Sequence, residues 1–306
     1  MKKRTRSGRN RFMRLGVPIY HSVKTEKLCM ARASERRRKS DAAGSRGEGG
    51  SPSKGLDRSL SLLEILAGVD GISLSDIALT AGVPASTAHR ILMTLEAHKF
   101  VTQDEERGLW FIGVRAFEIG NAFLRHRKIV DIGRARMHEL MEQSGESVNL
   151  AIEDNDEAVY VAQVESHQSV RAFHRAGSRG PLHALAVGKA LLSTMDDDAV
   201  RLVLQRTGLN SFSQNTITDP QRLFDELARA RARGWAENNE EHEAGMCAVA
   251  APVFDEHGAA MAALSVTGPA TRMPPERLGE LGPMVQRAAA EITRSIGGRA
   301  PDRASN

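Results

Sequence analysis

Residues 85–90 of the 306-residue chain read Ala-Ser-Thr-Ala-His-Arg and bring hydroxyl, imidazole and guanidinium groups together. Serine and threonine hydroxyls bond bases or phosphates, alanine and the threonine methyl group touch thymine methyls, and arginine holds a guanine or a phosphate. The chemistry that this set favours is recognition of double-stranded DNA. The candidate contacts are Ala85, Ser86, Thr87, His89 and Arg90.

The sequence lacks the patterns on which common catalytic sites are built. It contains no Gly-x-Ser-x-Gly, no Gly-x-x-x-x-Gly-Lys-Ser/Thr and no His-Glu-x-x-His. Its two cysteines, Cys29 and Cys247, are far apart, which excludes Cys-cluster zinc motifs. Four histidines also lack tight metal-ligand spacing: His167, His174, His183 and His242. We therefore expect no enzymatic activity, no cofactor and no metal.

The elements around residues 85–90 are typical of a helix-turn-helix. Leucines at helical spacing predict a first helix that begins after Ser53 and ends at Gly68. The run 73–76, Ser-Leu-Ser-Asp, is a capping-box pattern that predicts a second helix over about 74–80. A turn at 81–83 follows, and Pro84 fits the first turn of a third helix.

Two short apolar runs, 100–103 and 109–112, flank a charged turn that contains Gly108 and predict a β-hairpin. Three helices and a hairpin make a winged helix-turn-helix, in which the N-terminal residues of the second motif helix reach base edges. A winged helix used for protein contact is the alternative. It draws some support from charge, because residues 54–120 hold 6 Lys/Arg against 9 Asp/Glu.

The positive charge of the chain is concentrated in an N-terminal tail. Residues 1–53 hold 15 Lys/Arg and 4 Asp/Glu, a net of +11, so the remainder carries 4 − 11 = −7. Gly, Ser and like charges predict disorder there. The tail is either a phosphate-attracting arm or an inert extension, including the possibility that the true start lies at Met30 or later.

The second half of the chain changes from helical to strand periodicity. Residues 114–143 are helical and join two domains, with an apolar stripe that is either a dimer seam or packs on its own domain. The expected strands are 148–152, 159–164, 170–173, 246–254 and 259–267, and the expected helices are 184–195, 197–206, 220–233 and 275–296. This order predicts an α+β sensor-like domain.

No stretch approaches the roughly 20 apolar residues of a membrane-spanning helix, and the basic N-terminus lacks the apolar core of a secretory signal. The scarcity of cysteine suits a reducing compartment. We expect a cytoplasmic protein with no membrane partner.

Several motifs, in this order and spacing, resemble those of the IclR family of bacterial transcription regulators over residues 55–298. They are Arg58-Ser59-Leu60, the run 82–92, Pro181-Leu182-His183-Ala184, Gly188-Lys189-Ala190, and the runs 240–245, 250–254 and 265–269. The resemblance implies an N-terminal winged helix-turn-helix, a linker helix and a C-terminal GAF-like α+β effector domain. It also adds Arg58, which opens the first helix, to the candidate DNA contacts.

The resemblance further implies an effector-responsive regulator, which we expect to be a repressor. It implies homodimers, often assembled into tetramers, on operator DNA. The expected organisation is a tail over 1–53, a DNA-binding domain over 54–119, a linker helix over 120–133, an effector domain over 134–298 and a disordered C-terminus over 299–306.

In this family the effector is commonly a small organic acid. The resemblance places its carboxylate on the backbone N–H groups of Ala186 and Val187, at a helix start that also suits an anion physically. It makes Ala172 a wall residue. The remaining candidates are Asn238, Ala248, Ser265 and Thr267, where Asn238 stands for the family's aspartate and Ala248 for its cysteine.

These departures remove polar groups from the expected pocket, so we expect a larger, partly apolar acid, such as an aromatic or branched carboxylate. The alternative is a degenerate pocket in a ligand-independent, DNA-bound scaffold. Cys247 takes the place of a family arginine and lies one strand position from Ala248. Its side chain should therefore point to the opposite face of the sheet as a buried, unreactive thiol.

Overall fold

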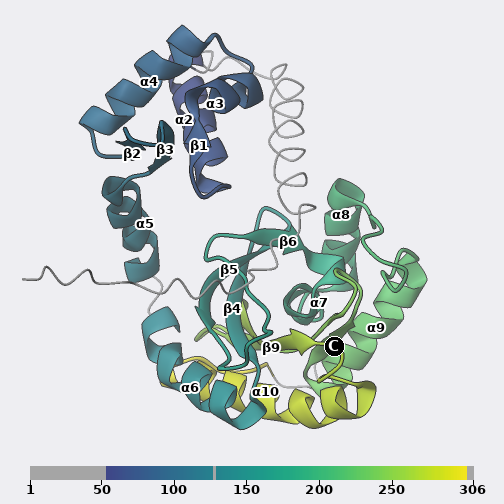
Figure 1. Cartoon of the computed structure of the whole chain (residues 1–306). Coiled ribbons are helices and arrows are strands. Elements are labelled where there is room, and N and C mark those ends of the chain that lie inside the picture. The colour runs from purple at the N-terminus through teal and green to yellow at the C-terminus, as the bar shows by residue number, and fades with distance from the viewer. Residues whose placement is uncertain (1–52, 127–128, 302–306) are drawn as a thin grey trace, which may run out of the picture. The chain divides into compact units, whose positions relative to one another are not determined.

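The computed structural model describes residues 53–126 and 129–301, which form two compact units with their boundary between Ala122 and Phe123 (Figure 1). The predicted tail over 1–53, except its last residue, lies outside the described residues, as do Cys29, two residues of the predicted linker and the last five residues.

The N-terminal unit contains the expected helix-turn-helix. Its helices are α2 (Lys54–Ala67), α3 (Leu74–Ala81) and α4 (Ala85–Ala97). Ser73 caps α3 as the capping box predicts, because its Oγ accepts the Asp76 N–H at 3.2 Å and donates to Asp76 Oδ2 at 2.7 Å. Gly82 ends α3 with φ 62°, a left-handed conformation that favours glycine. The chain is thereby turned sharply into α4.

The predicted hairpin is formed by β2 (Val101–Asp104) and β3 (Leu109–Ile112), with Val101 opposite Ile112. A third short strand, β1 (Ile72–Ser73), pairs with β3 and was not predicted. Two residues are too few to show a periodicity, so only the partner strand reveals it. Trp110 of β3 is completely buried in the core of this unit, among side chains from α2, α3, α4 and β2.

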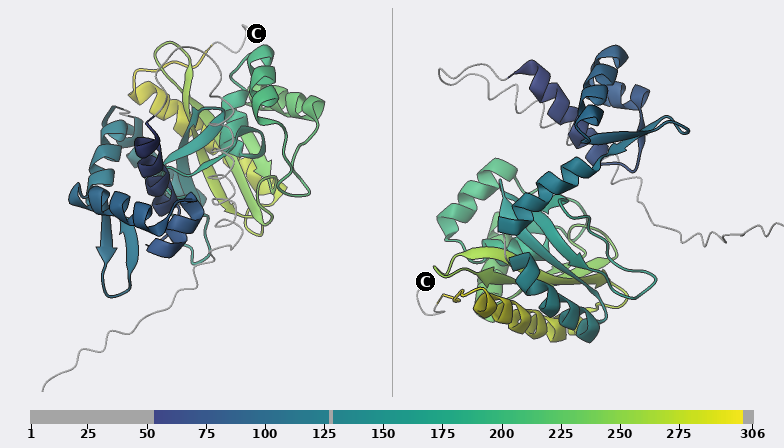
Figure 2. Two further views of the ribbon diagram at one scale, coloured as in Figure 1. Left: turned by 90° about the horizontal axis from the view of Figure 1, so that it is seen from above. Right: turned by 90° about the vertical axis from the view of Figure 1, so that its left-hand side faces the viewer.

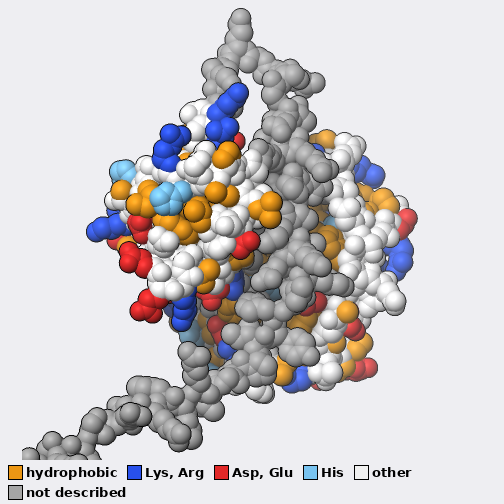
Figure 3. All heavy atoms as spheres, turned by 45° about the horizontal axis from the view of Figure 1, so that its top comes forward, with side chains coloured by type: hydrophobic (Ala, Val, Ile, Leu, Met, Phe, Trp, Pro, Cys, Tyr) orange, Lys and Arg blue, Asp and Glu red, His pale blue; other side chains and the backbone are white. Residues whose placement is uncertain are grey.

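Not all the leucines that predicted the first helix enter this core. Leu66 is buried and Leu63 half-buried, whereas Leu56 and Leu60 are 60% and 52% exposed. Val114 and Phe117 of α5 (Val114–His126) are also exposed. The space-filling view in Figure 3 shows apolar side chains among charged ones on the described surface.

The C-terminal unit is built on a six-stranded antiparallel sheet in the order β6-β5-β4-β9-β8-β7. The strands are β4 (Ser147–Asp154), β5 (Glu157–Val164), β6 (Arg179–Pro181), β7 (Ala236–Asn239), β8 (Met246–Phe254) and β9 (Ala260–Pro269). This confirms the predicted α+β class.

Helices cover both faces of the larger sheet (Figure 2). α6 (Ile129–Ser144) and α10 (Pro275–Ser295) pack on one face. The other face carries the 3-10 turn η1 (Leu182–Ala184), α7 (Ala186–Leu192), α8 (Asp197–Thr207) and α9 (Pro220–Arg233). Strand alternation divides β8 between the two cores: Cys247 and Val249 face the first, Ala248 and Ala250 the second.

Three details of this unit differ from prediction. Residues 170–173 form no strand, because the Ala172 carbonyl accepts side-chain hydrogen bonds from Ser147 and Gln163 in place of a ladder. The helix expected over 184–195 is η1 followed by α7, with Leu185 extended between them. The edge strands β6 and β7 were missed, because both are short and one is polar.

None of the helices in the described ranges is long and apolar enough to cross a membrane.

Candidate functional site

The DNA-facing residues predicted from sequence lie at the start of α4. Ala88 and Leu92 bury the inner face of this helix, while Ala85, Ser86, His89 and Arg90 are exposed and Thr87 is half-buried. The Thr94 hydroxyl donates to the Arg90 carbonyl at 3.0 Å, one turn along the helix. Arg58 is exposed on α2, a different helix. No described residue forms an ion pair with Arg58 or Arg90, so both guanidinium groups remain available to phosphates or bases.

Met93, which was not among the predicted contacts, is 46% exposed on α4. It lies one turn after His89 and Arg90, on the side of the helix that the candidate contacts share. The sequence held a sign of this exposure, because Met93 does not fall on the helix face that Ala88 and Leu92 bury.

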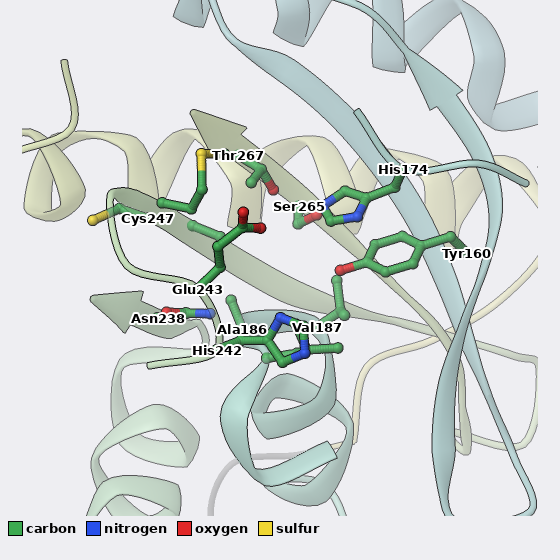
Figure 4. Close-up of a pocket in the computed structure, with 13 residues that line it drawn as sticks. Tyr160, His174, Ala186, Val187, Asn238, His242, Glu243, Cys247, Ser265 and Thr267 are labelled. Atoms are coloured by element: carbon green, nitrogen blue, oxygen red, sulfur yellow. The ribbon is translucent and has the colours of Figure 1, made fainter. Parts of the chain in front are cut away.

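A pocket in the C-terminal unit opens between the start of α7 and the sheet (Figure 4). Six of the seven predicted effector residues line it: Ala186, Val187, Asn238, Ala248, Ser265 and Thr267. Ala172 is buried but is not among the lining residues. Its carbonyl is instead held by Ser147 Oγ at 2.9 Å, behind the wall.

Seven further residues line the pocket without having been predicted as contacts: Tyr160, His174, Leu185, His242, Glu243, Met246 and Cys247. They come from β5, the loop after it, the residue before α7, the β7–β8 loop and the start of β8. The cavity has a volume of about 30 Å³, room for about two water molecules. A larger ligand therefore requires these side chains to move.

Hydroxyl groups of β9 form the polar wall of the pocket. Thr267 Oγ1 accepts a hydrogen bond from Asn149 Nδ2 at 3.2 Å, and Asn149 Oδ1 accepts one from Gln163 Nε2 at 2.9 Å. This leaves the Thr267 hydroxyl proton free to be donated. The Ser265 hydroxyl is buried, and it forms no hydrogen bond with any described group. Because a buried polar group without a partner is costly, Ser265 marks where a ligand or water atom is needed.

Asn238 already uses its amide inside the protein. Its Nδ2 donates to the Ala184 carbonyl at 2.9 Å, and its Oδ1 accepts the Glu241 N–H at 2.8 Å. It thereby ties β7 to the turn before α7 and to the β7–β8 loop. Its geometry supports a positioning role beside the pocket, with one N–H left for a ligand.

A buried ion pair holds α7 against the same loop. Lys189 Nζ lies 2.5 Å from Glu241 Oε1 and 2.7 Å from Oε2, with the lysine side chain fully buried and the glutamate nearly so. Burial raises the pKa of the Glu241 carboxyl, although the nearby ammonium opposes this. Gly188 packs so closely that a Cβ would lie 2.2 Å from the Leu182 carbonyl oxygen. The start of α7 is therefore fixed from both sides.

Aromatic rings lie in and behind the remaining walls: Tyr160, His174 and His242 line the pocket, whereas Phe212 and His183 do not. Tyr160 and His174 stack at 4.2 Å between ring centroids and 4° between planes. Phe212 lies between His242 and His183, and His183 Nε2 is 3.0 Å from the Asn210 carbonyl oxygen. Burial, assisted by His242, lowers the pKa of His174 to about 4. The His174 imidazole is therefore neutral at neutral pH.

The low pKa of His174 predicts a stability change on acidification. The unfolded chain takes up a proton at this histidine near pH 6.5 and the folded chain only near pH 4, so folding stability falls as the pH drops through this window. The loss should reach about 2–3 kcal/mol, and His174→Gln should abolish that part of it. Urea unfolding between pH 7.5 and 4 measures it. His98→Gln, at an exposed histidine of the N-terminal unit, is the control and should not abolish this loss.

Cys247 lies at the edge of this pocket. Its Sγ donates a weak hydrogen bond to Asn239 Oδ1 at 3.5 Å, and the residue belongs to the core on the opposite face of the sheet from Ala248. Burial raises the pKa of its thiol, which makes it a poor nucleophile at neutral pH. No group of described residues has the three His, Cys, Asp or Glu side chains that a metal ion would need.

Two protein-family models match this chain, one in each of its two units. A family model described as "IclR helix-turn-helix domain" matches residues 55–105, and one described as "Bacterial transcriptional regulator IclR C-terminal" matches residues 121–294. The acetate operon repressor of Salmonella typhimurium is 41% identical over 79% of this chain and 90% of its own length.

Two solved structures extend this comparison. The Thermotoga maritima IclR structure has a TM-score of 0.68 and 31% identity, covering 79% of this chain and 98% of that one. An IclR homologue from Microbacterium hydrocarbonoxydans, complexed with 4-hydroxybenzoate, has a TM-score of 0.70 and 26% identity. That comparison covers 79% of this chain and 99% of the homologue.

Proposed function

This chain belongs to the IclR family of bacterial transcriptional regulators, and from that premise we propose that it is a repressor whose DNA affinity is set by an organic acid in the pocket beside α7. It is a DNA-binding regulator and not an enzyme. The helix-turn-helix contacts operator DNA through Arg58, Ala85, Ser86, Thr87, His89 and Arg90. The place of action is the cytoplasm, where the DNA lies.

The observation that carries the effector proposal is the buried Ser265 hydroxyl, which has no hydrogen-bond partner among the described groups although it lines the pocket. A carboxylate oxygen supplies the missing acceptor, and the Thr267 proton supplies a second hydrogen bond. The N–H groups of Ala186 and Val187 lie in the first turn of α7, which no side chain caps. Ala248 leaves room for the body of the ligand.

An aromatic or branched acid is the ligand class that we propose. The 4-hydroxybenzoate in the Microbacterium homologue supports this class, as do the apolar Leu185, Val187 and Met246 in the pocket wall. Because the cavity has a volume of about 30 Å³, lining side chains must move to admit such a ligand. A pocket that never opens would instead favour a ligand-independent DNA-bound scaffold.

The effector proposal is tested by calorimetry of carboxylic acids against the full chain. Thr267→Val keeps the side-chain shape and should weaken binding by about 1–3 kcal/mol, because it removes the hydroxyl. Ala248→Phe should block a bulky acid by overlap while DNA binding without the acid stays intact. If no acid binds while operator binding persists, the scaffold is the correct function. An acid whose affinity ignores both substitutions would place the effector elsewhere.

A second prediction concerns the operator. Arg90→Ala should weaken binding to a genomic fragment selected by the wild-type chain by about 1–3 kcal/mol if Arg90 holds a guanine, and the loss should depend on sequence. If Arg90 contacts only phosphate, binding should weaken for every DNA sequence. The slope of log affinity against log salt concentration should then fall by about one. Gel-shift titration at several salt concentrations separates the two. A footprint unchanged by Arg90→Ala and by Ser86→Ala with Thr87→Ala would contradict the assignment.

We also propose that the chain acts as a homodimer, which can assemble further into a tetramer. The exposed Leu56 and Leu60 of α2 and Val114 and Phe117 of α5 support this, because large apolar residues left in water often mark a surface that a partner covers. In a dimer, the two copies of α4 would bind DNA together, and this avidity would strengthen the binding of an acidic DNA-binding domain. Light scattering of the purified chain measures the assembly.

A further inference from the structure

The β7–β8 loop carries three glutamates, and two of them serve the protein itself. Glu240 Oε2 accepts the Gly245 N–H at 2.7 Å, and Glu241 forms the buried pair with Lys189. Glu243 differs, because no described residue forms a hydrogen bond or ion pair with its carboxylate. Figure 4 shows the Glu243 side chain among those that line the pocket.

The direction of Glu243 follows from a loop that is fixed at several points. The Glu241 carbonyl accepts Thr216 Oγ1 at 2.5 Å and Ser213 Oγ at 3.1 Å, and the Glu241 N–H is bound to Asn238. The turn closes through the Met246 N–H, which donates to the Glu243 carbonyl at 3.2 Å. The backbone of this loop therefore holds Glu243 in place. Because Glu243 is exposed whereas Ser265 and Thr267 are buried, Glu243 lies at the mouth of the pocket.

The Glu243 carboxylate matters because few other ionisable groups line the pocket. Its lining contains no lysine and no arginine, and its only other ionisable groups near neutrality are the imidazoles of His174 and His242. Both rings face the pocket in Figure 4. Tyr160 stacks on His174, and the Gln163 side chain accepts the His174 backbone N–H at 3.3 Å. With the His174 imidazole neutral, Glu243 supplies the only carboxylate in the lining of the pocket.

We propose that Glu243 selects the effector: the pocket accepts an acid with one carboxylate and a hydroxyl or amino group for Glu243, and it rejects dicarboxylates. The single carboxylate binds at the inner end, at the Ser265 and Thr267 hydroxyls. The donor group of the ligand gives a charge-assisted hydrogen bond to Glu243 at the mouth. A second carboxylate would instead meet the Glu243 charge, and the pocket lining has no lysine or arginine to offset the repulsion. This inference rests on the proposed function of the pocket.

Two matched ligand series test the selection, each with a hydroxy acid, a plain acid and a dicarboxylate. The aromatic series is 4-hydroxybenzoate, benzoate and terephthalate, and the small series is glycolate, acetate and oxalate, so that ligand size does not confound the result. Calorimetry of the full chain at pH 8 measures each affinity. In the series that binds, the hydroxy acid should bind about tenfold more tightly than the plain acid, with the dicarboxylate weaker still.

Glu243→Gln keeps the shape of the side chain and removes its charge. It should bring the hydroxy and plain acids to within roughly threefold of each other and strengthen dicarboxylate binding by about tenfold or more. Glu256→Gln is the matched control, since it removes the same charge from the exposed β8–β9 turn. It should change neither ratio.

The outcomes separate this inference from the function on which it rests. If acids bind but both ratios survive Glu243→Gln, the pocket is correct and the role of Glu243 is wrong. Equal shifts in Glu243→Gln and Glu256→Gln would also overturn it, because they would show only long-range charge. If neither series binds the wild-type chain or Glu243→Gln, the effector pocket itself is refuted.

Discussion

Lys189→Met is expected to lower the free energy of unfolding of the C-terminal unit by about 3–5 kcal/mol, because it leaves the Glu241 carboxylate buried without its partner. Such a loss is a large share of the stability of a typical domain. It should also reach the pocket, since the pair joins α7 to the loop that carries His242 and Glu243. Urea unfolding followed by the fluorescence of Trp235, which lies in this unit, measures it.

The pH dependence of this loss identifies its cause. An unpaired Glu241 is tolerated better once protonated, so the penalty of Lys189→Met should be greater at pH 8 than at pH 5. Adding Glu241→Gln to Lys189→Met removes the buried charge and should restore part of the stability. A penalty that is independent of pH and is not relieved in the double variant would show that Lys189 acts through packing alone.

Trp110→Ala is expected to lower the stability of the N-terminal unit by about 3–5 kcal/mol, because it empties the centre of a small core. DNA binding should be lost with the fold, while binding of an acid in the C-terminal unit should persist. Circular dichroism, gel shift and calorimetry on the same preparation measure the three effects.

Trp110→Phe is the informative companion. The indole Nε1 is buried and has no hydrogen-bond partner among the described groups, so phenylalanine removes an unsatisfied donor together with some volume. The two effects oppose each other, and the cost should fall to about 1 kcal/mol or less. A phenylalanine variant as unstable as the alanine variant would mean that the indole N–H is bonded to water in solution.

The helix-turn-helix could be predicted in detail from the sequence, because short-range interactions specify it. Ser73 and Asp76 meet within one helical turn, Gly82 takes the left-handed conformation at the end of α3, and the hairpin closes over a few residues. Periodicity likewise predicted β4, β5, β8 and α9 closely. Prediction failed for 170–173, where distant side chains rather than a neighbouring strand hold the backbone.

Some residues of the pocket could likewise be predicted from local sequence motifs, whereas others are brought to it only by long-range contacts. The family resemblance of the motifs indicated Ala186, Val187, Ser265 and Thr267, whose place follows from strand register and the start of one helix. Tyr160, His174 and Glu243 join them only when the sheet and loop come together. The free Ser265 hydroxyl, the engaged Asn238 amide and the Lys189–Glu241 pair are equally invisible in the sequence. Hydrogen bonding and desolvation depend on every atom that surrounds a group, and those atoms are assembled only by the tertiary fold.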